Sequence, residues 1–169
     1  MTLKQAFDYY DVESVWHFTD LSNISSIVKY GLLSLREIEA QQIDVSRYGA
    51  DRLSHRLDRR RGLDTFVHLA FMMDHPMYHI AKHRGSIVRG MWIELPVSVV
   101  LQDDVRFCNE VANKFGSKLY TQYDIANNIS FNDMFYGADF HTKKEARKAE
   151  ILVPNKIDAS QIIGVYDGK

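Results

Sequence analysis

Short apolar stretches, the first of which alternates with polar positions, predict strands along the whole chain. These segments are rich in valine, isoleucine, leucine and aromatic residues, which favour extended structure. We expect strands at 14–19, 65–71, 90–96, 149–154 and 162–166. Helical segments separate them, so the pattern predicts an α+β fold.

Apolar residues at helical spacing predict three helices between the strands. The segments are 21–31, with Ser22 as N-cap and Gly31 as stop; 33–43; and 75–85, with Pro76 in its first turn. Residues 102–148 show weak periodicity, and there we expect short helices with a long irregular loop, a kind of segment that is often functional. The chain has no repeat or Pro/Gly-rich linker, so we expect a single domain over 1–169.

Composition fits a soluble globular protein, with 46% hydrophobic and 25% charged residues. No apolar run approaches the roughly 18 residues that span a bilayer, and the first residues do not look like a secretory signal. The single cysteine, Cys108, has no partner for an internal disulfide, and we interpret it as a small buried hydrophobe. We therefore expect a cytoplasmic protein without membrane contact.

Charge is unevenly distributed although the net charge is only −1. Residues 47–61 contain six arginines against two aspartates. One interpretation is a solvated helix face. The other is a phosphate site, because guanidinium groups match phosphate oxygens in a bidentate manner.

The stretch "KKEARKAEILVP" places four cations just before Glu150, which begins an apolar strand. A carboxylate there either faces solvent at a strand end or points into a cleft. His17 lies within the first strand, where it is either a packed structural residue or a ligand for a ribose hydroxyl. Asn23 either caps the next helix or marks a helix N-terminus that receives an anion.

His75, His79 and His83 recur every four residues and could chelate a metal. No HExxH glutamate accompanies them, and the outer two lie about 12 Å apart along a helix. We therefore expect no metal site.

Three segments, in order, resemble the DarT family of NAD-dependent DNA ADP-ribosyltransferases, bacterial toxins with the ADP-ribosyltransferase fold. They are "WHFTDLSNISSIVKYGLLS", "GLDTFVHLAFMMDHPMYHI" and "RKAEILVPNKIDASQIIGV". The resemblance implies mixed twisted β-sheets flanked by short helices, with NAD as co-substrate and no metal. His68 and Leu69 depart from the family, because they stand where it has bulkier residues. This departure leaves open the target base, thymine or guanine, and the choice of DNA over RNA.

The resemblance also assigns roles to residues. Glu150 is the implied catalytic glutamate, and Arg56 the essential arginine, with Arg52 as the alternative. The implied NAD contacts are His17, Thr19, Asn23, Leu32, Arg52 and Met77, with Tyr78 near the nicotinamide end. The implied nucleic-acid contacts are Arg47, Lys143, Lys144 and Arg147. The implied partners are single-stranded DNA and a cognate macrodomain antitoxin.

These residue types suit the chemistry. When nicotinamide leaves, the ribose becomes oxocarbenium-like, and a carboxylate can stabilise that charge and accept a proton from the attacking base. Single strands bind through backbone charge and stacking, and the loop before Glu150 offers both lysines and aromatic rings. Modification of RNA and a non-catalytic nucleotide-binding module remain competing hypotheses.

Overall fold

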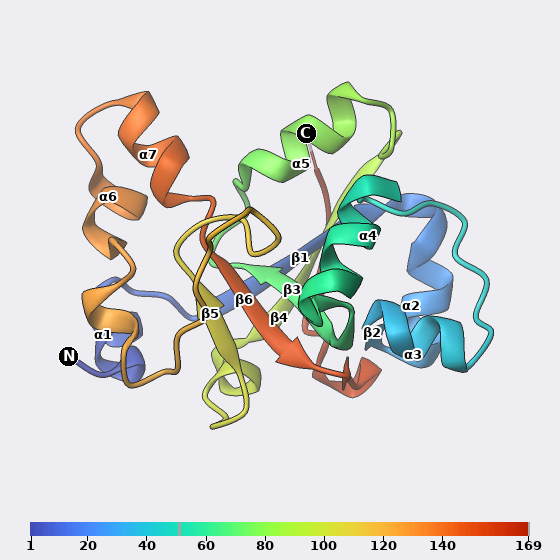
Figure 1. The fold of residues 1–169 in the computed structure, drawn as a ribbon, viewed down its shortest axis with the longest axis horizontal. Helices are drawn as coiled ribbons and strands as arrows, with labels where there is room; N and C mark the ends of the chain where they lie inside the picture. Colours follow the sequence, from blue (N-terminus) through green and yellow to red (C-terminus); the bar gives the residue numbers. More distant parts are fainter. Residues whose placement is uncertain (51, 169) are drawn as a thin grey trace.

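A six-stranded antiparallel sheet forms the centre of the molecule (Figure 1). The computed structural model describes residues 1–50 and 52–168. The strand order is β5-β6-β3-β1-β4-β8, and β2 and β7 form a separate pair. The strands are β1 Ser14–Asp20, β2 Leu32–Leu33, β3 Phe66–Ala70, β4 Gly90–Pro96, β5 Arg106–Cys108, β6 Glu150–Pro154, β7 Lys156–Ile157 and β8 Gly164–Asp167. The five expected strands are confirmed, whereas β5 and the short β2–β7 pair were not predicted.

Seven short helices flank the sheet. They are α1 Leu3–Tyr9, α2 Ile24–Tyr30, α3 Leu35–Ala40, α4 Arg52–Arg61, α5 Pro76–His83, α6 Phe131–Tyr136 and α7 Phe140–Ala146, all within the described residues. In Figure 1, α1, α6 and α7 gather at one end of the molecule and α2 and α3 at the other. The three predicted helices are confirmed, while α1 was not expected. None of the helices in the described part of the chain is long and apolar enough to cross a membrane.

The cap predicted at the start of α2 is wrong. Asp20, not Ser22, caps this segment, because its carboxylate accepts hydrogen bonds from the N–H and hydroxyl of Ser22. A 3-10 turn, Leu21–Asn23, precedes α2, so Asn23 occupies the N-cap position, but its side chain makes no capping bond. The side chain of Asn23 is therefore available for other contacts.

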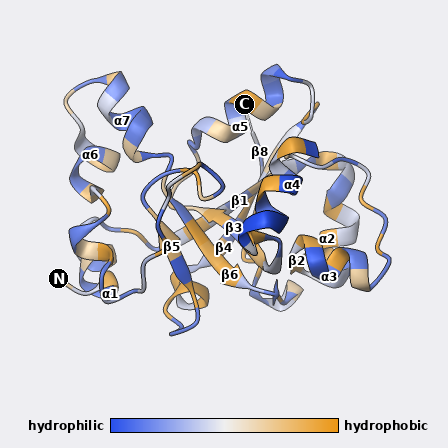
Figure 2. Ribbon diagram, viewed as in Figure 1, coloured by the Kyte–Doolittle hydropathy of each residue, from blue (hydrophilic) through white to orange (hydrophobic). Residues whose placement is uncertain are grey.

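Both faces of the sheet are covered by apolar side chains, and β6 is largely orange, that is hydrophobic, in Figure 2. On one face Ile93, Phe107 and Ile151 pack in the main core with Phe7 of α1. On the other face Trp92 packs against the side of α5. Each such side chain contributes about 1.5–3 kcal/mol by leaving water. Cys108 is buried, as predicted.

The sheet opens in its middle. β1 pairs with β4 along its full length, and β3 pairs likewise with β6. β1 and β3 meet at one pair, Trp16 opposite Ala70. Beyond it, the His17 Nδ1–H donates to the His68 carbonyl at 3.0 Å, so a side chain replaces the missing backbone bond. This separation of the two half-sheets creates the space for a site.

Gly31 closes one side of that space. Its φ is +83°, and a Cβ would lie 2.3 Å from the Ile157 carbonyl oxygen. Only glycine fits this turn without strain. The chain can then turn directly from α2 into β2, which pairs with β7.

Candidate active site

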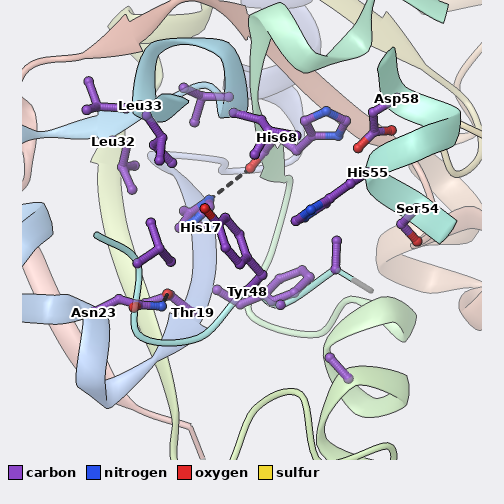
Figure 3. A pocket seen from close by; sticks show the side chains of 18 of the residues that line it. His17, Thr19, Asn23, Leu32, Leu33, Tyr48, Ser54, His55, Asp58 and His68 are labelled. Carbon is purple, nitrogen blue, oxygen red and sulfur yellow. Dashed lines mark hydrogen bonds between the residues drawn. The ribbon is translucent and has the colours of Figure 1, made fainter. Parts of the chain in front are cut away.

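A cavity of about 280 Å³ lies between the separated strands β1 and β3. Its walls come from β1, α2, the segment 43–50, α4, β3, α5 and the start of β6. Figure 3 shows His17 in the middle of the cavity, with Thr19 and Asn23 on one side and His55, Asp58 and His68 on the other. The volume fits part of a small ligand, and the mostly apolar walls carry a few polar side chains that can orient it.

His17 is neutral and has a defined tautomer. Burial lowers its pKa, and the hydrogen bond to the His68 carbonyl only partly opposes that effect. Because a carbonyl accepts, the proton of the neutral ring lies on Nδ1. The other ring nitrogen, Nε2, is consequently an acceptor and suits a ligand hydroxyl.

Asn23 fastens the segment 43–50 to β1. Its Nδ2 donates to Thr19 Oγ1 at 3.1 Å and to the Arg47 carbonyl at 2.5 Å, and its Oδ1 accepts the Arg47 N–H at 3.3 Å. The Arg47 guanidinium donates to the Gly85 carbonyl at 3.2 Å. Asn23 thus fixes an arginine at the edge of the cavity.

Glu150 is held in the cavity wall as a buried anion, with 8% of its surface exposed. Its Oε2 accepts the Ala112 N–H at 3.0 Å and faces His68 Nδ1 at 3.3 Å. Burial alone would raise its pKa, but the hydrogen bond and charge of His68 outweigh burial and lower it. Burial likewise opposes the charge of His68, yet Glu150 and Asp58 raise its pKa to about 9. The pair is therefore ionised at neutral pH.

Seven of the residues predicted for the site lie around this cavity. They are His17, Thr19, Asn23, Leu32, Arg47, Met77 and Glu150. Arg47 was expected to contact nucleic acid, whereas here it borders the same cavity as the residues expected to contact NAD.

Arg52 and Arg56 are not among the described residues that line the cavity. Ser54 and Asp58 do line it and are four positions apart, so they share one face of α4. Arg56 lies two positions from each, about 200° around the helix. Both arginines are exposed.

Lys143, Lys144 and Arg147 belong to α7 and its C-terminal end, outside the cavity lining. Arg147 is mostly buried: its Nε donates to the Met134 carbonyl at 3.1 Å, and its guanidinium pairs with Asp74. It thereby ties the turn before Glu150 to the loop before α5.

Two histidines and Tyr78 have structural contacts. The buried His75 caps α5, because its Nδ1 accepts the Met77 N–H, while the exposed His79 bonds to Asp74. Among the described residues, no group of three or more His, Cys, Asp or Glu side chains could hold a metal ion. Tyr78 packs in the core beside Trp92 and is not among the described residues that line the cavity.

Asp58, His55 and Tyr48 line the cavity but were not predicted from the sequence, and no role was predicted for His68. His55 and Asp58 lie within the arginine-rich segment, whose most prominent feature is its positive charge. Their positions relative to Ser54, one and four residues on, place all three toward one side of a helix. His68 was noted only as a departure from a family pattern.

Solved structures share this fold. One is Thermosipho africanus DarTG in complex with ADP-ribose, with a TM-score of 0.72 and 24% identity, covering 90% of this chain and 43% of that one. Another is Thermus sp. 2.9 DarT in complex with ADP-ribosylated ssDNA, with a TM-score of 0.70 and 16% identity, covering 92% and 81%. Thermus sp. 2.9 DarT in complex with NAD+ is also similar, with a TM-score of 0.62 and 15% identity, covering 92% and 81%.

The fold is therefore that of the ADP-ribosyltransferases. A family described as "ssDNA thymidine ADP-ribosyltransferase, DarT" matches residues 16–167. Because the match spans most of the chain, this protein belongs to the DarT family.

A relative from Thermosipho africanus is described as a DNA ADP-ribosyl transferase–DNA ADP-ribosyl glycohydrolase fusion protein. It is 28% identical over 166 residues, which cover 90% of this chain and 42% of the relative. The chain thus spans less than half the length of that fusion protein.

Proposed function

We propose that this protein transfers ADP-ribose from NAD to the thymine base of single-stranded DNA and releases nicotinamide. One observation carries the proposal: an ionised, buried glutamate, Glu150, lies in the wall of the same cavity as His17, Thr19 and Asn23. The fold and the family match support the same reaction.

Glu150 is suited to stabilise the reacting sugar. As the bond between ribose and nicotinamide breaks, positive charge develops on the ribose, and a carboxylate in a partly dry cavity stabilises it more strongly than in water. Both hydrogen bonds to Glu150 engage Oε2, so we assign Oε1 to the substrate. The carboxylate then accepts the proton that the base nitrogen loses when it forms the new bond.

The ribose and the diphosphate have separate candidate partners. His17 Nε2, as an acceptor, suits a ribose hydroxyl. Arg47, held by Asn23 at the edge of the cavity, suits the diphosphate, since guanidinium groups bind phosphate oxygens in a bidentate manner. Arg52 and Arg56 remain the alternatives that the family resemblance favours.

The segment before Glu150 suits a single strand. Lys144 is exposed on α7, and the Tyr136 and Phe140 rings are exposed beside it, at 65% and 80%. Lysines attract the phosphate backbone and exposed rings stack on bases. A base that is already unpaired also reaches the ribose without the cost of unstacking a duplex.

We also propose an antitoxin partner that reverses the modification. The Thermosipho africanus relative joins a DNA ADP-ribosyl transferase to a DNA ADP-ribosyl glycohydrolase in one chain. For this protein, the partner would be a macrodomain glycohydrolase that removes ADP-ribose from the same modified DNA. Co-expression with such a partner should remove ADP-ribose from cellular DNA.

The test is mass spectrometry of oligonucleotides incubated with the protein and NAD. We expect thymidine-containing single strands to gain one ADP-ribose on the base, and Glu150→Gln to slow the reaction at least about a hundredfold. Glu145→Gln, an exposed glutamate on α7, is the matched control and should react normally.

Two results would contradict the proposal. One is binding of NAD with no ADP-ribose on any thymidine-containing DNA, which would indicate a non-catalytic module. The other is a fully active Glu150→Gln variant. Two further substrates are tested in parallel. RNA shows whether the enzyme requires deoxyribose, and DNA without thymidine shows whether it requires thymine.

A further inference from the structure

His68 connects the two halves of the site. Its backbone carbonyl accepts the His17 Nδ1–H at 3.0 Å, and its side chain faces Glu150 at 3.3 Å. It stands on β3, the strand that separates from β1. One residue therefore contacts both the histidine proposed to bind ribose and the proposed catalytic carboxylate.

The surroundings of His68 select its protonated form. Nδ1 faces the Glu150 carboxylate, and Nε2 faces the Leu63 carbonyl at 3.4 Å. Both partners are acceptors, and only the imidazolium ion carries a proton on both ring nitrogens.

Among the described residues, His68 interacts with Glu150 of β6, Asp58 of α4, His17 of β1 and His75 before α5. Figure 3 shows that His55 of α4 lies on the same side of the cavity as His68 and Asp58. Burial lowers the pKa of both His17 and His75, so neither adds positive charge at neutral pH. Burial would lower the pKa of His68 as well, but the two carboxylates raise it to about 9. Electrostatics and hydrogen-bond geometry thus agree on a charged His68.

Asp58 of α4 also stabilises that charge. Figure 3 shows its carboxylate on the His68 side of the cavity. Its Oδ1 is buried and has no hydrogen-bond partner among the described residues. Burial raises the pKa of Asp58, and His68 is the largest influence in the opposite direction. The charges of Asp58 and His68 therefore stabilise each other, while a hydrogen bond with Asn113 and the charge of His55 also favour the Asp58 carboxylate.

We propose that His68, as an imidazolium ion supported by Asp58, is a positioning residue that fixes the Glu150 carboxylate for ADP-ribose transfer. It binds Oε2 together with the Ala112 N–H and so leaves Oε1 to the ribose. Because it already carries both protons, it cannot accept one from the substrate and is not a proton relay. This inference rests on the proposed role of Glu150.

The test compares replacements of His68 in the transfer of ADP-ribose to a thymidine oligonucleotide between pH 6 and 10. His68→Ala removes the hydrogen bond and the charge, and we expect kcat to fall about tenfold to a hundredfold with little change in the KM for NAD. His68→Asn retains an N–H in place of Nδ1 without the charge, so it should recover only part of the loss, and the remaining loss reports the contribution of the charge. His83→Asn, an exposed histidine of α5 outside the cavity, is the matched control.

The pH profile separates positioning from simple structural support. For the wild-type protein we expect kcat to decline near pH 9, as His68 loses its proton. His68→Asn should lack this decline, whereas Asp58→Asn should move it to lower pH. The thymine base titrates equally in all variants, so only differences between variants are interpreted.

Different results would overturn different statements. If Glu150→Gln is inactive but His68→Ala and His68→Asn keep the wild-type kcat, the positioning role is wrong. It is also wrong if His68→Asn retains the decline near pH 9. A fully active Glu150→Gln would instead reject the proposed role of Glu150. If His68→Ala fails to fold, the profile of His68→Asn decides.

Discussion

At the scale of single residues, the side chain of Asn23 can bind the segment 43–50 because it does not cap α2. It stands at the start of α2 without capping that helix, and its amide instead binds both backbone groups of Arg47. These paired hydrogen bonds order the exposed segment around Arg47 before a ligand arrives, so ligand binding loses less conformational entropy. The backbone of Arg47 is therefore preorganised beside the cavity, whereas Arg52 and Arg56 are not among the described residues that line it.

This difference predicts which arginine matters for NAD. Arg47→Ala should weaken NAD binding about tenfold to a hundredfold, the usual loss for a hydrogen-bonded charge of about 1.5–3 kcal/mol. Arg56→Ala and Arg52→Ala, on other faces of α4, should bind NAD as the wild type does. Calorimetric titration with NAD measures the three variants directly. A large loss confined to Arg56→Ala would restore the arginine that the family resemblance favours.

The site residues that lie in recognisable local sequence segments could be predicted from the sequence. Glu150, His17 and Asn23 lie in segments whose order resembles a family, and the structure brings them to one cavity. The choice among arginines could not be made, because it depends on which face of α4 turns inward. The partnership of His68 with Glu150 joins residues 82 positions apart, and no local pattern predicts it.

At the scale of elements, Asp20 holds together the end of β1, the following turn and the segment just before β4. Its carboxylate accepts hydrogen bonds from the N–H groups of Ser22 at 3.0 Å, Val88 at 2.7 Å and Arg89 at 3.1 Å. Burial opposes its ionisation, but these bonds and the Ser22 hydroxyl lower its pKa to about 2. The folded state therefore favours the carboxylate over the protonated acid.

We expect Asp20→Asn to lower the free energy of unfolding by about 2 kcal/mol or more at pH 7. The folded pKa lies below the unfolded value of 3.8, so this stability is present above about pH 4 and is lost as the pH falls toward 2. Urea unfolding at pH 7 and pH 3 measures both effects. Asp8→Asn, an exposed aspartate paired with Lys4 on α1, is the control and should change little. Equal stability of Asp20→Asn and wild type at pH 7 would contradict this role.

Elements with strong apolar patterns were predictable from the sequence, and those defined by few residues were not. β1, β3 and β6 have clear apolar patterns, whereas β5 has only three residues and is defined by its pairing with β6 and by a bridge between Phe107 and Tyr120. The start of α1 did carry a local signal, since Thr2 and Gln5 form a capping box. Burial of Phe7 then stabilises this single short helix.

At the scale of the whole molecule, the net charge is only −1, but the arginines and lysines lie in places with different environments. Arg47 borders the cavity, and Arg147 is used inside the protein, bound to Asp74 and the Met134 carbonyl. Lys143 and Lys144 lie on α7, in the segment that leads to Glu150. In Figure 1 this helix is at the opposite end of the molecule from α2 and β2. A single strand that reaches Glu150 past α7 would thus meet local positive charge on a nearly neutral protein.

This arrangement predicts a local salt dependence of DNA binding. Removing both charges, as Lys143→Ala with Lys144→Ala, should weaken binding of single-stranded DNA and reduce the slope of log affinity against log salt by about 1 to 1.5, because each lost phosphate contact removes about 0.7. Lys29→Ala with Lys156→Ala, two exposed lysines near α2 and β2, removes the same charge and should leave the slope unchanged. Fluorescence anisotropy with a labelled thymidine oligonucleotide at several salt concentrations measures both double variants. Equal slopes for the two would mean that net charge, and not the position of α7 beside Glu150, governs how the strand is bound.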